Sequence, residues 1–72
     1  MTEERQELAI LDTRIGECKQ HITEQRERVA RMKQLGKNTE DSEQLLSNLL
    51  HSLAALEQLR ELVLQEVKDA QH

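Results

Sequence analysis

Residues 8–32, which read LAILDTRIGECKQHITEQRERVARM, decide the fold. Within them, one set of side chains recurs at alternating spacings of three and four residues, which keeps the set along one side of an α-helix. This is the heptad period of a coiled coil, and we assign position a to Leu8. The pattern predicts a helix over about residues 3–35, with a seam formed by Leu8, Leu11, Ile15, Cys18, Ile22, Gln25, Val29 and Met32.

Gly36 ends the heptad pattern and predicts a turn over residues 36–38. Glycine fits the left-handed conformation that closes many helices. Either Asn38 or Thr39 then offers the N-cap of a second helix over about residues 39–69. A link this short places the two helices antiparallel and adjacent. The fold class is therefore all-α, a hairpin of two long helices.

The second helix carries a wide apolar stripe. Its leucines occupy more of the helix surface than a two-residue seam requires, and a broad apolar face usually contacts more than one neighbour. The first helix covers only part of it, so we expect the stripe to form a dimer or partner interface. The predicted interface residues are Leu45, Leu46, Leu49, Leu50, Leu53, Leu56, Leu59 and Val63.

The predicted core is the meeting of the two apolar stripes. It comprises Leu8, Leu11, Ile15, Cys18, Ile22, Val29, Met32, Leu46, Leu49, Leu53, Leu56, Val63 and Val67.

Composition places the chain among small helical proteins. Its 72 residues include no Pro and no aromatic residue, and 33% are charged, as is typical of long helices and coiled coils. Domains below about 70–80 residues usually need a disulfide, a metal or a partner. The single cysteine forms no internal disulfide. Self-association into a homodimer, as a four-helix bundle, is the expected solution.

Charges at the heptad positions beside the seam select the pairing. In a parallel dimer of the first helix, Glu7 would face Asp12, and Arg14 would face Lys19, so like charges would meet. An antiparallel pairing avoids this. Within the hairpin, a turn near residues 37–38 predicts four opposite-charge pairs: Glu7 with Lys68, Arg14 with Glu61, Lys19 with Glu57, and Lys33 with Glu43.

The best signal for nucleic acid is a basic cluster near the end of the first helix, within residues 26–37. Five positive side chains could contact phosphates. The net charge of −4 and the absence of aromatic side chains that stack on bases count against it. A nucleic-acid-associated regulator is therefore the alternative function, with contacts from Arg26, Arg28, Arg31, Lys33 and Lys37.

Four positions carry two interpretations each. Gln25 either fixes the register as a buried polar group or reaches water at an edge. Arg60 either extends its aliphatic stem to solvent or pairs with a carboxylate such as Glu57 or Asp12. Gly16 is either a tolerated surface residue or a point of close backbone approach. Cys18, three residues before His21, is either a small core residue or half of a zinc site completed by a second copy.

The sequence shows no enzyme signature, because it has no glycine-rich phosphate loop and no nucleophile with a matched base. We expect no catalytic activity, no cofactor and no metal. No stretch approaches the roughly 18 consecutive apolar residues of a membrane span. The polar, acidic start differs from a signal peptide. A cytoplasmic location is the expectation.

Residues 21–29 (HITEQRERV) and 35–40 (LGKNTE) carry a resemblance. The chain resembles a group of short bacterial helical-hairpin proteins of unknown function, which share the first helix, a G-x-[DN]-T turn and a leucine-rich second helix. The resemblance covers roughly residues 15–65. It implies a hairpin and a bacterial source, and no activity. Together these features predict a non-catalytic protein–protein interaction or scaffold module that acts as a homodimer, with itself or another helical protein as partner.

Overall fold

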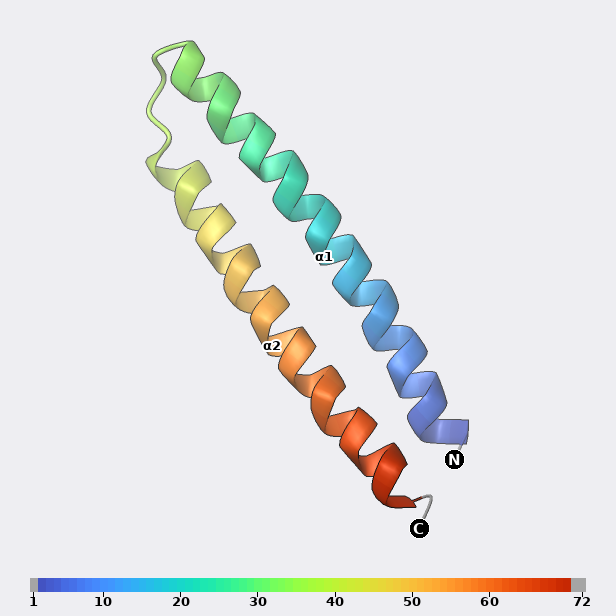
Figure 1. Ribbon diagram of the computed structural model, residues 1–72. Helices are drawn as coiled ribbons and strands as arrows, with labels where there is room; N and C mark the ends of the chain where they lie inside the picture. Colours follow the sequence, from blue (N-terminus) through green and yellow to red (C-terminus); the bar gives the residue numbers. More distant parts are fainter. Residues whose placement is uncertain (1, 71–72) are drawn as a thin grey trace.

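The computed structural model describes residues 2–70, which form two long antiparallel helices (Figure 1). Helix α1 spans Thr2–Gln34 and helix α2 spans Glu40–Ala70. The start of α1 and the end of α2 lie together at the end opposite the link, and the hairpin extends over 58 × 15 × 11 Å. The predicted all-α hairpin is confirmed. The link, residues 35–39, is longer than the expected turn because α1 ends at residue 34.

A Schellman motif ends α1. The amide of Lys37 donates to the carbonyl of Met32 at 2.9 Å, and the amide of Gly36 donates to the carbonyl of Lys33 at 3.1 Å. Gly36 has φ 68°, the left-handed conformation in which a Cβ is strained. The last carbonyls of α1 are thereby satisfied within the link, and the chain reverses direction.

Two residues share the capping of α2. The Asn38 side chain accepts a hydrogen bond from the amide of Glu40 at 2.9 Å, and the Thr39 carbonyl accepts one from the amide of Glu43 at 2.8 Å. Asn38 therefore supplies the side-chain cap, while Thr39 begins the helical hydrogen bonding. Acidic residues follow in the first turn, where the helix dipole favours them.

The first turn of α1 is acidic as well. A hydrogen bond from its own backbone amide is the main cause that holds the pKa of Glu4 below its ordinary value. Both helices therefore begin with negative charge at the positive end of the dipole.

The second helix has a heptad seam of its own, which faces α1. Every residue of this seam is buried or half-buried, and the alternation of spacings matches that of the α1 seam. With Leu46 at position a, the α2 seam consists of Ser42, Leu46, Leu49, Leu53, Leu56, Arg60, Val63 and Val67.

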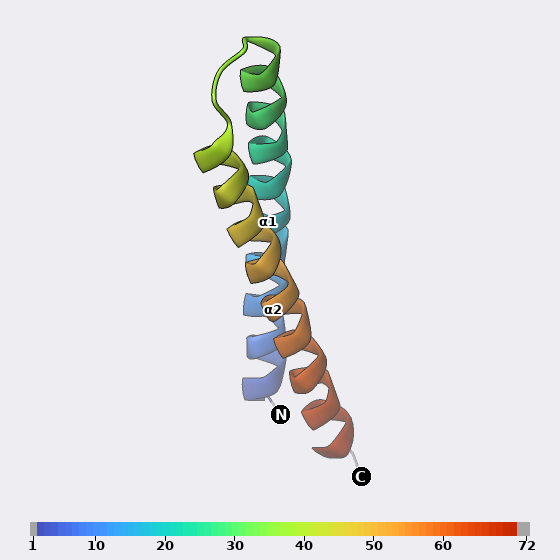
Figure 2. The same ribbon diagram turned by 90° about the vertical axis from the view of Figure 1, so that its left-hand side faces the viewer.

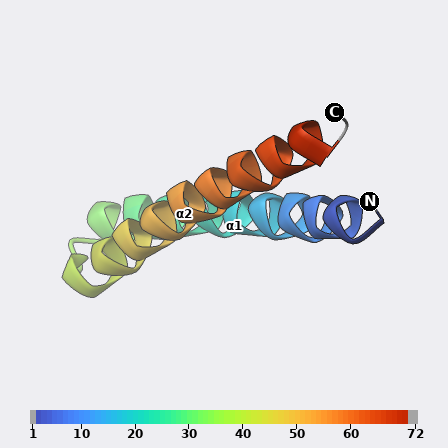
Figure 3. The same ribbon diagram turned by 90° about the horizontal axis from the view of Figure 1, so that it is seen from below.

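The core is one layer of side chains between two helices. In α1 the predicted core residues from Leu11 to Val29 are buried, whereas Leu8 and Met32 are half-buried. In α2 only Val63 is buried, at 4% exposure, and the other predicted core residues keep more of their surface. Figures 2 and 3 show the reason, because α2 is inclined across α1 and nothing else in residues 2–70 covers the outer side of either helix.

Within residues 2–70, two ion pairs join the helices, one predicted outright and one as an alternative. Lys33 Nζ lies 3.1 Å from Glu43 Oε1, as predicted, and Arg60 Nε lies 2.6 Å from Asp12 Oδ1. Of the two interpretations of Arg60, the structure therefore supports the second, in which Arg60 pairs with a carboxylate. Both pairs are substantially solvent-exposed, so each contributes at most about 1 kcal/mol.

The other three predicted pairs do not form among residues 2–70, so that part of the register prediction is wrong. Glu7 and Arg14 occupy heptad position g, whereas their intended partners Lys68 and Glu61 occupy position b. These positions point to different sides of the hairpin. The register is displaced as well: the predicted pairs would place Cys18 near Glu57, whereas Cys18 is hydrogen-bonded to Leu49 and Gln25 to Ser42. Lys19 and Glu57 share the e positions and still make no ion pair.

The two glycines predict opposite effects of the same substitution. Gly36→Ala should lower the free energy of unfolding by about 1 kcal/mol, because alanine is strained at φ 68°. Gly16→Ala should raise it by about 1 kcal/mol, because Gly16 lies inside α1 and a Cβ there meets nothing within 4 Å. Urea unfolding followed by circular dichroism measures both. Equal effects of the two substitutions would contradict the assigned end of α1.

Candidate interaction surface

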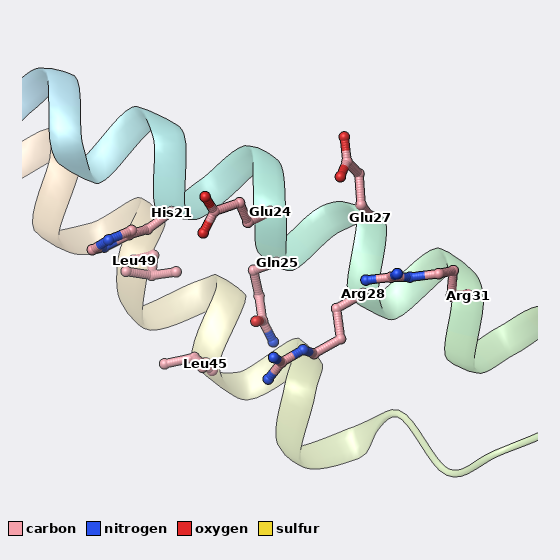
Figure 4. A pocket seen from close by; sticks show the side chains of 8 residues that line it. All are labelled: His21, Glu24, Gln25, Glu27, Arg28, Arg31, Leu45 and Leu49. Carbon is pink, nitrogen blue, oxygen red and sulfur yellow. The ribbon is translucent and has the colours of Figure 1, made fainter.

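The hairpin has two long sides, which the heptad positions distinguish. Positions g and c of both helices point to one side, which we call the g-side, and positions e and b point to the other, the e-side. An open groove lies on the g-side where the helices meet, lined by His21, Arg28 and Arg31 of α1 and by Leu45 of α2 (Figure 4). The ion pair between Lys33 and Glu43 lies at e positions, on the opposite side.

Exposed apolar side chains gather on the g-side. Among the residues whose burial is described, large apolar side chains are exposed at six positions, and Leu50 is the only one of these on the e-side. Leu62, for example, keeps 58% of its surface exposed. The g-side members are Ile10, Leu45, Leu59 and Leu62, and the remaining residue, Leu35, lies in the link.

The structure divides the predicted interface residues into two groups. Leu45, Leu50 and Leu59 are exposed and unused by the hairpin. The remaining members belong to the seam that faces α1, where they are buried or half-buried: Leu46, Leu49, Leu53, Leu56 and Val63. Half-burial leaves the outer edge of these side chains available beside the exposed leucines.

Three exposed apolar residues were not among the predicted interface residues. Leu62 was detectable, because it lies one turn after Leu59 on the same flank of the heptad pattern. Leu35 was assigned to the end of the first helix, and it lies instead in the link, 70% exposed. Ile10 stands alone on its flank of α1, so the sequence pattern gave no signal for it.

The basic cluster does not form one surface. Arg28 and Arg31 lie on the g-side at the groove, whereas Arg26 and Lys33 occupy e positions on the other side, and Lys37 lies in the link. All five are exposed. The positive charges therefore surround the end of α1, and Lys33 is already paired with Glu43.

Gln25 is the polar residue of the α1 seam, and it is buried at 6% exposure. Its side-chain amide donates a hydrogen bond to the Ser42 carbonyl at 2.8 Å. The first of its two interpretations, a buried polar group that fixes the register, fits this geometry. The hydrogen bond joins α1 to the first turn of α2 and favours one alignment of the helices.

Cys18 and His21 point to different surroundings. Cys18 is buried, and its Sγ donates a hydrogen bond to the Leu49 carbonyl at 3.4 Å. His21 is exposed and lines the g-side groove, where Figure 4 shows it beside Leu49. Within residues 2–70, no three His, Cys, Asp or Glu side chains are grouped so that they could hold a metal ion.

Comparisons with family models, with curated proteins and with solved structures found no match to this chain. The resemblance to short bacterial hairpin proteins therefore rests on the quoted sequence motifs alone. Within the described part of the chain, neither helix is apolar enough along its length to cross a membrane.

Because the Gln25 amide is buried, replacing it with a carboxylate of the same shape should change the stability of the hairpin. Gln25→Glu should lower the free energy of unfolding by about 1–3 kcal/mol at pH 7, because a carboxylate would be desolvated against the Ser42 carbonyl. The loss should shrink as the pH falls, since the burial raises the pKa of the new carboxyl and the protonated form can donate to Ser42. Urea unfolding of mutant and wild type, compared at pH 7 and pH 4, measures both effects.

Gln58→Glu is the matched control, because Gln58 is exposed at the outer position f of α2. It should change the free energy of unfolding by less than about 0.5 kcal/mol at either pH. An equal effect of the two substitutions would contradict a structural role for the Gln25 amide.

Proposed function

We propose that this protein is a non-catalytic interaction module that acts as a homodimer, in which two hairpins form a four-helix bundle. The observation that carries the proposal is the concentration of exposed large apolar side chains on the g-side. Exposed large apolar side chains gathered on one side often mark an interface. A second copy of the hairpin would cover it and complete a core that two helices alone leave open.

The surface area supports this proposal. A compact protein of 8.4 kDa exposes about 4,600 Å², whereas this hairpin exposes 5730 Å². The excess is comparable with the roughly 800 Å² that each partner contributes to a typical stable interface. The Cα radius of gyration, 16.6 Å, likewise exceeds the roughly 11 Å of a compact chain of this length.

Charge favours a protein partner over nucleic acid. The described basic residues at the end of α1 are divided between two sides of the hairpin, so they present no continuous stripe to a phosphate backbone. Two of them, Arg28 and Arg31, border the groove between the helices, where a carboxylate of a partner could reach them. The nucleic-acid function remains the alternative and is an outcome of the test below.

Dimerisation predicts that thermal stability depends on protein concentration. Each tenfold increase in concentration should add about 1.4 kcal/mol to the free energy of unfolding of a dimer and raise Tm by about 3–6 °C. Circular dichroism melts over a hundredfold concentration range measure this. A Tm independent of concentration would overturn the homodimer.

The alternative function is tested by measuring how well the protein is retained on immobilised duplex DNA and RNA at low salt. We expect no retention of the wild type beyond that of a variant in which Arg26, Arg28 and Arg31 are all changed to Glu. Salt-dependent retention of the wild type that the triple substitution abolishes would instead establish the nucleic-acid function.

A further inference from the structure

We propose that the g-side is the dimer interface, and that the second copy binds it in reversed orientation, with each link end against the other copy's open end. This inference rests on the proposed homodimer and specifies its face and direction. Three properties of the g-side carry it: the positions of exposed leucines along α2, the difference in charge between its two ends, and the groove beside Arg28.

Leu45 and Leu62, two of the three exposed leucines on the g-side of α2, are placed symmetrically for a reversed copy, whereas Leu59 would face Asn48 of that copy. The g and c positions near the middle of the helix hold the small residues Ser52 and Ala55, with Leu45 towards the link and Leu62 towards the open end. If two copies of α2 cross at residues 52–55, Leu45 and Leu62 lie equally far from the crossing, about 13 Å. Leu45 of one copy then meets Leu62 of the other, twice.

The small residues at the crossing also favour close packing of two copies of α2. Ser52 and Ala55 are both exposed, so the hairpin makes no use of their size. Short side chains at a crossing point allow two helix backbones to approach closely. Larger leucines on either side then pack across the interface, at the heights where the crossing helices diverge.

Charges on the g-side differ between the two ends. At the link end Arg28 and Arg31 are balanced by the carboxylates of Glu24 and Asp41. The open end is acidic, because it carries Glu7, Glu17, Glu66 and Asp69 against Arg14. A reversed copy places the arginines of one link end against the acidic open end of the other copy, in both halves of the interface. A copy in the same orientation would bring the two acidic open ends together, which disfavours it.

The groove gives the partner's acidic side chain a place to bind. Figure 4 shows the Arg28 side chain reaching from α1 towards the first turns of α2, beside the buried Gln25, with Arg31 one turn further along. Leu45 and Leu49 form the α2 border of this groove, and Glu24 and Glu27 of α1 also line it. In the reversed dimer, Glu66 of the second copy would lie at this height, close to the apolar contact between Leu45 and Leu62.

The apolar part of the proposal is tested by two lysine substitutions at exposed leucines. Leu62→Lys, on the g-side, should weaken dimerisation at least about tenfold. Leu50→Lys, on the e-side, should change it by less than about threefold. Both leucines are exposed in the hairpin, so neither change should unfold it, and helicity by circular dichroism checks this. Sedimentation equilibrium of the full chain measures the dissociation constants.

Orientation is tested by reversing the charge at each end. We expect Arg28→Glu with Arg31→Glu to weaken the homodimer, and Glu7→Lys with Glu66→Lys to weaken it likewise. An equimolar mixture of these two variants should dimerise as tightly as the wild type, because both ends regain opposite charges. Lys19→Glu with Arg26→Glu, which makes the same change of net charge at e positions, is the control and should have the smaller effect.

The outcomes separate this inference from the proposed function. A dimer that resists Leu62→Lys but is lost with Leu50→Lys would overturn the g-side interface while the homodimer stands. Preferential pairing of the wild type with the Arg28→Glu, Arg31→Glu variant would overturn the reversed orientation, because it requires link end against link end. A wild type that is monomeric at every concentration would overturn the proposed function and this inference together.

Discussion

Two helices in contact share a single seam, and this constraint governs the rest of the structure. The heptad residues of α1 and α2 face each other along that seam, yet no described side chain is fully buried, and no described residue covers the outer surface of either helix. A hairpin with one layer of core gains little from apolar burial relative to the entropy of ordering its chain. Apolar residues outside the seam therefore point to a further contact.

Polar residues within the seam define the alignment of the two helices. Near the link, Gln25 donates to the Ser42 carbonyl, and near the open end Arg60 pairs with Asp12. Slippage along the seam would break both interactions and leave the Gln25 amide buried without a partner, which is costly. The link adds a fixed length, because the Schellman motif at Gly36 and the Asn38 cap leave the chain little freedom. These features together favour one register over its neighbours.

The sequence predicted the hairpin because its signals are local and periodic. The heptad spacing from Leu8 to Met32, the glycine at residue 36 and the leucines of α2 each depend on neighbours within a few residues. The side of the hairpin to which a charge points depends on its heptad position, and its height depends on the length of the link. The prediction ignored the first and misplaced the second, so Glu7 and Arg14 were given wrong partners. Assigning heptad positions to α2 in the same way separates seam residues such as Leu49 from exposed residues such as Leu62.

The central claim is that the uncovered apolar side closes on a second copy, and the mass in solution tests it most directly. Light scattering should be measured on the full chain over a wide range of concentrations. The account predicts a mass of twice the 8.4 kDa chain that persists on dilution to the micromolar range. A mass of one chain at every concentration would contradict it and leave Leu45, Leu59 and Leu62 exposed to solvent.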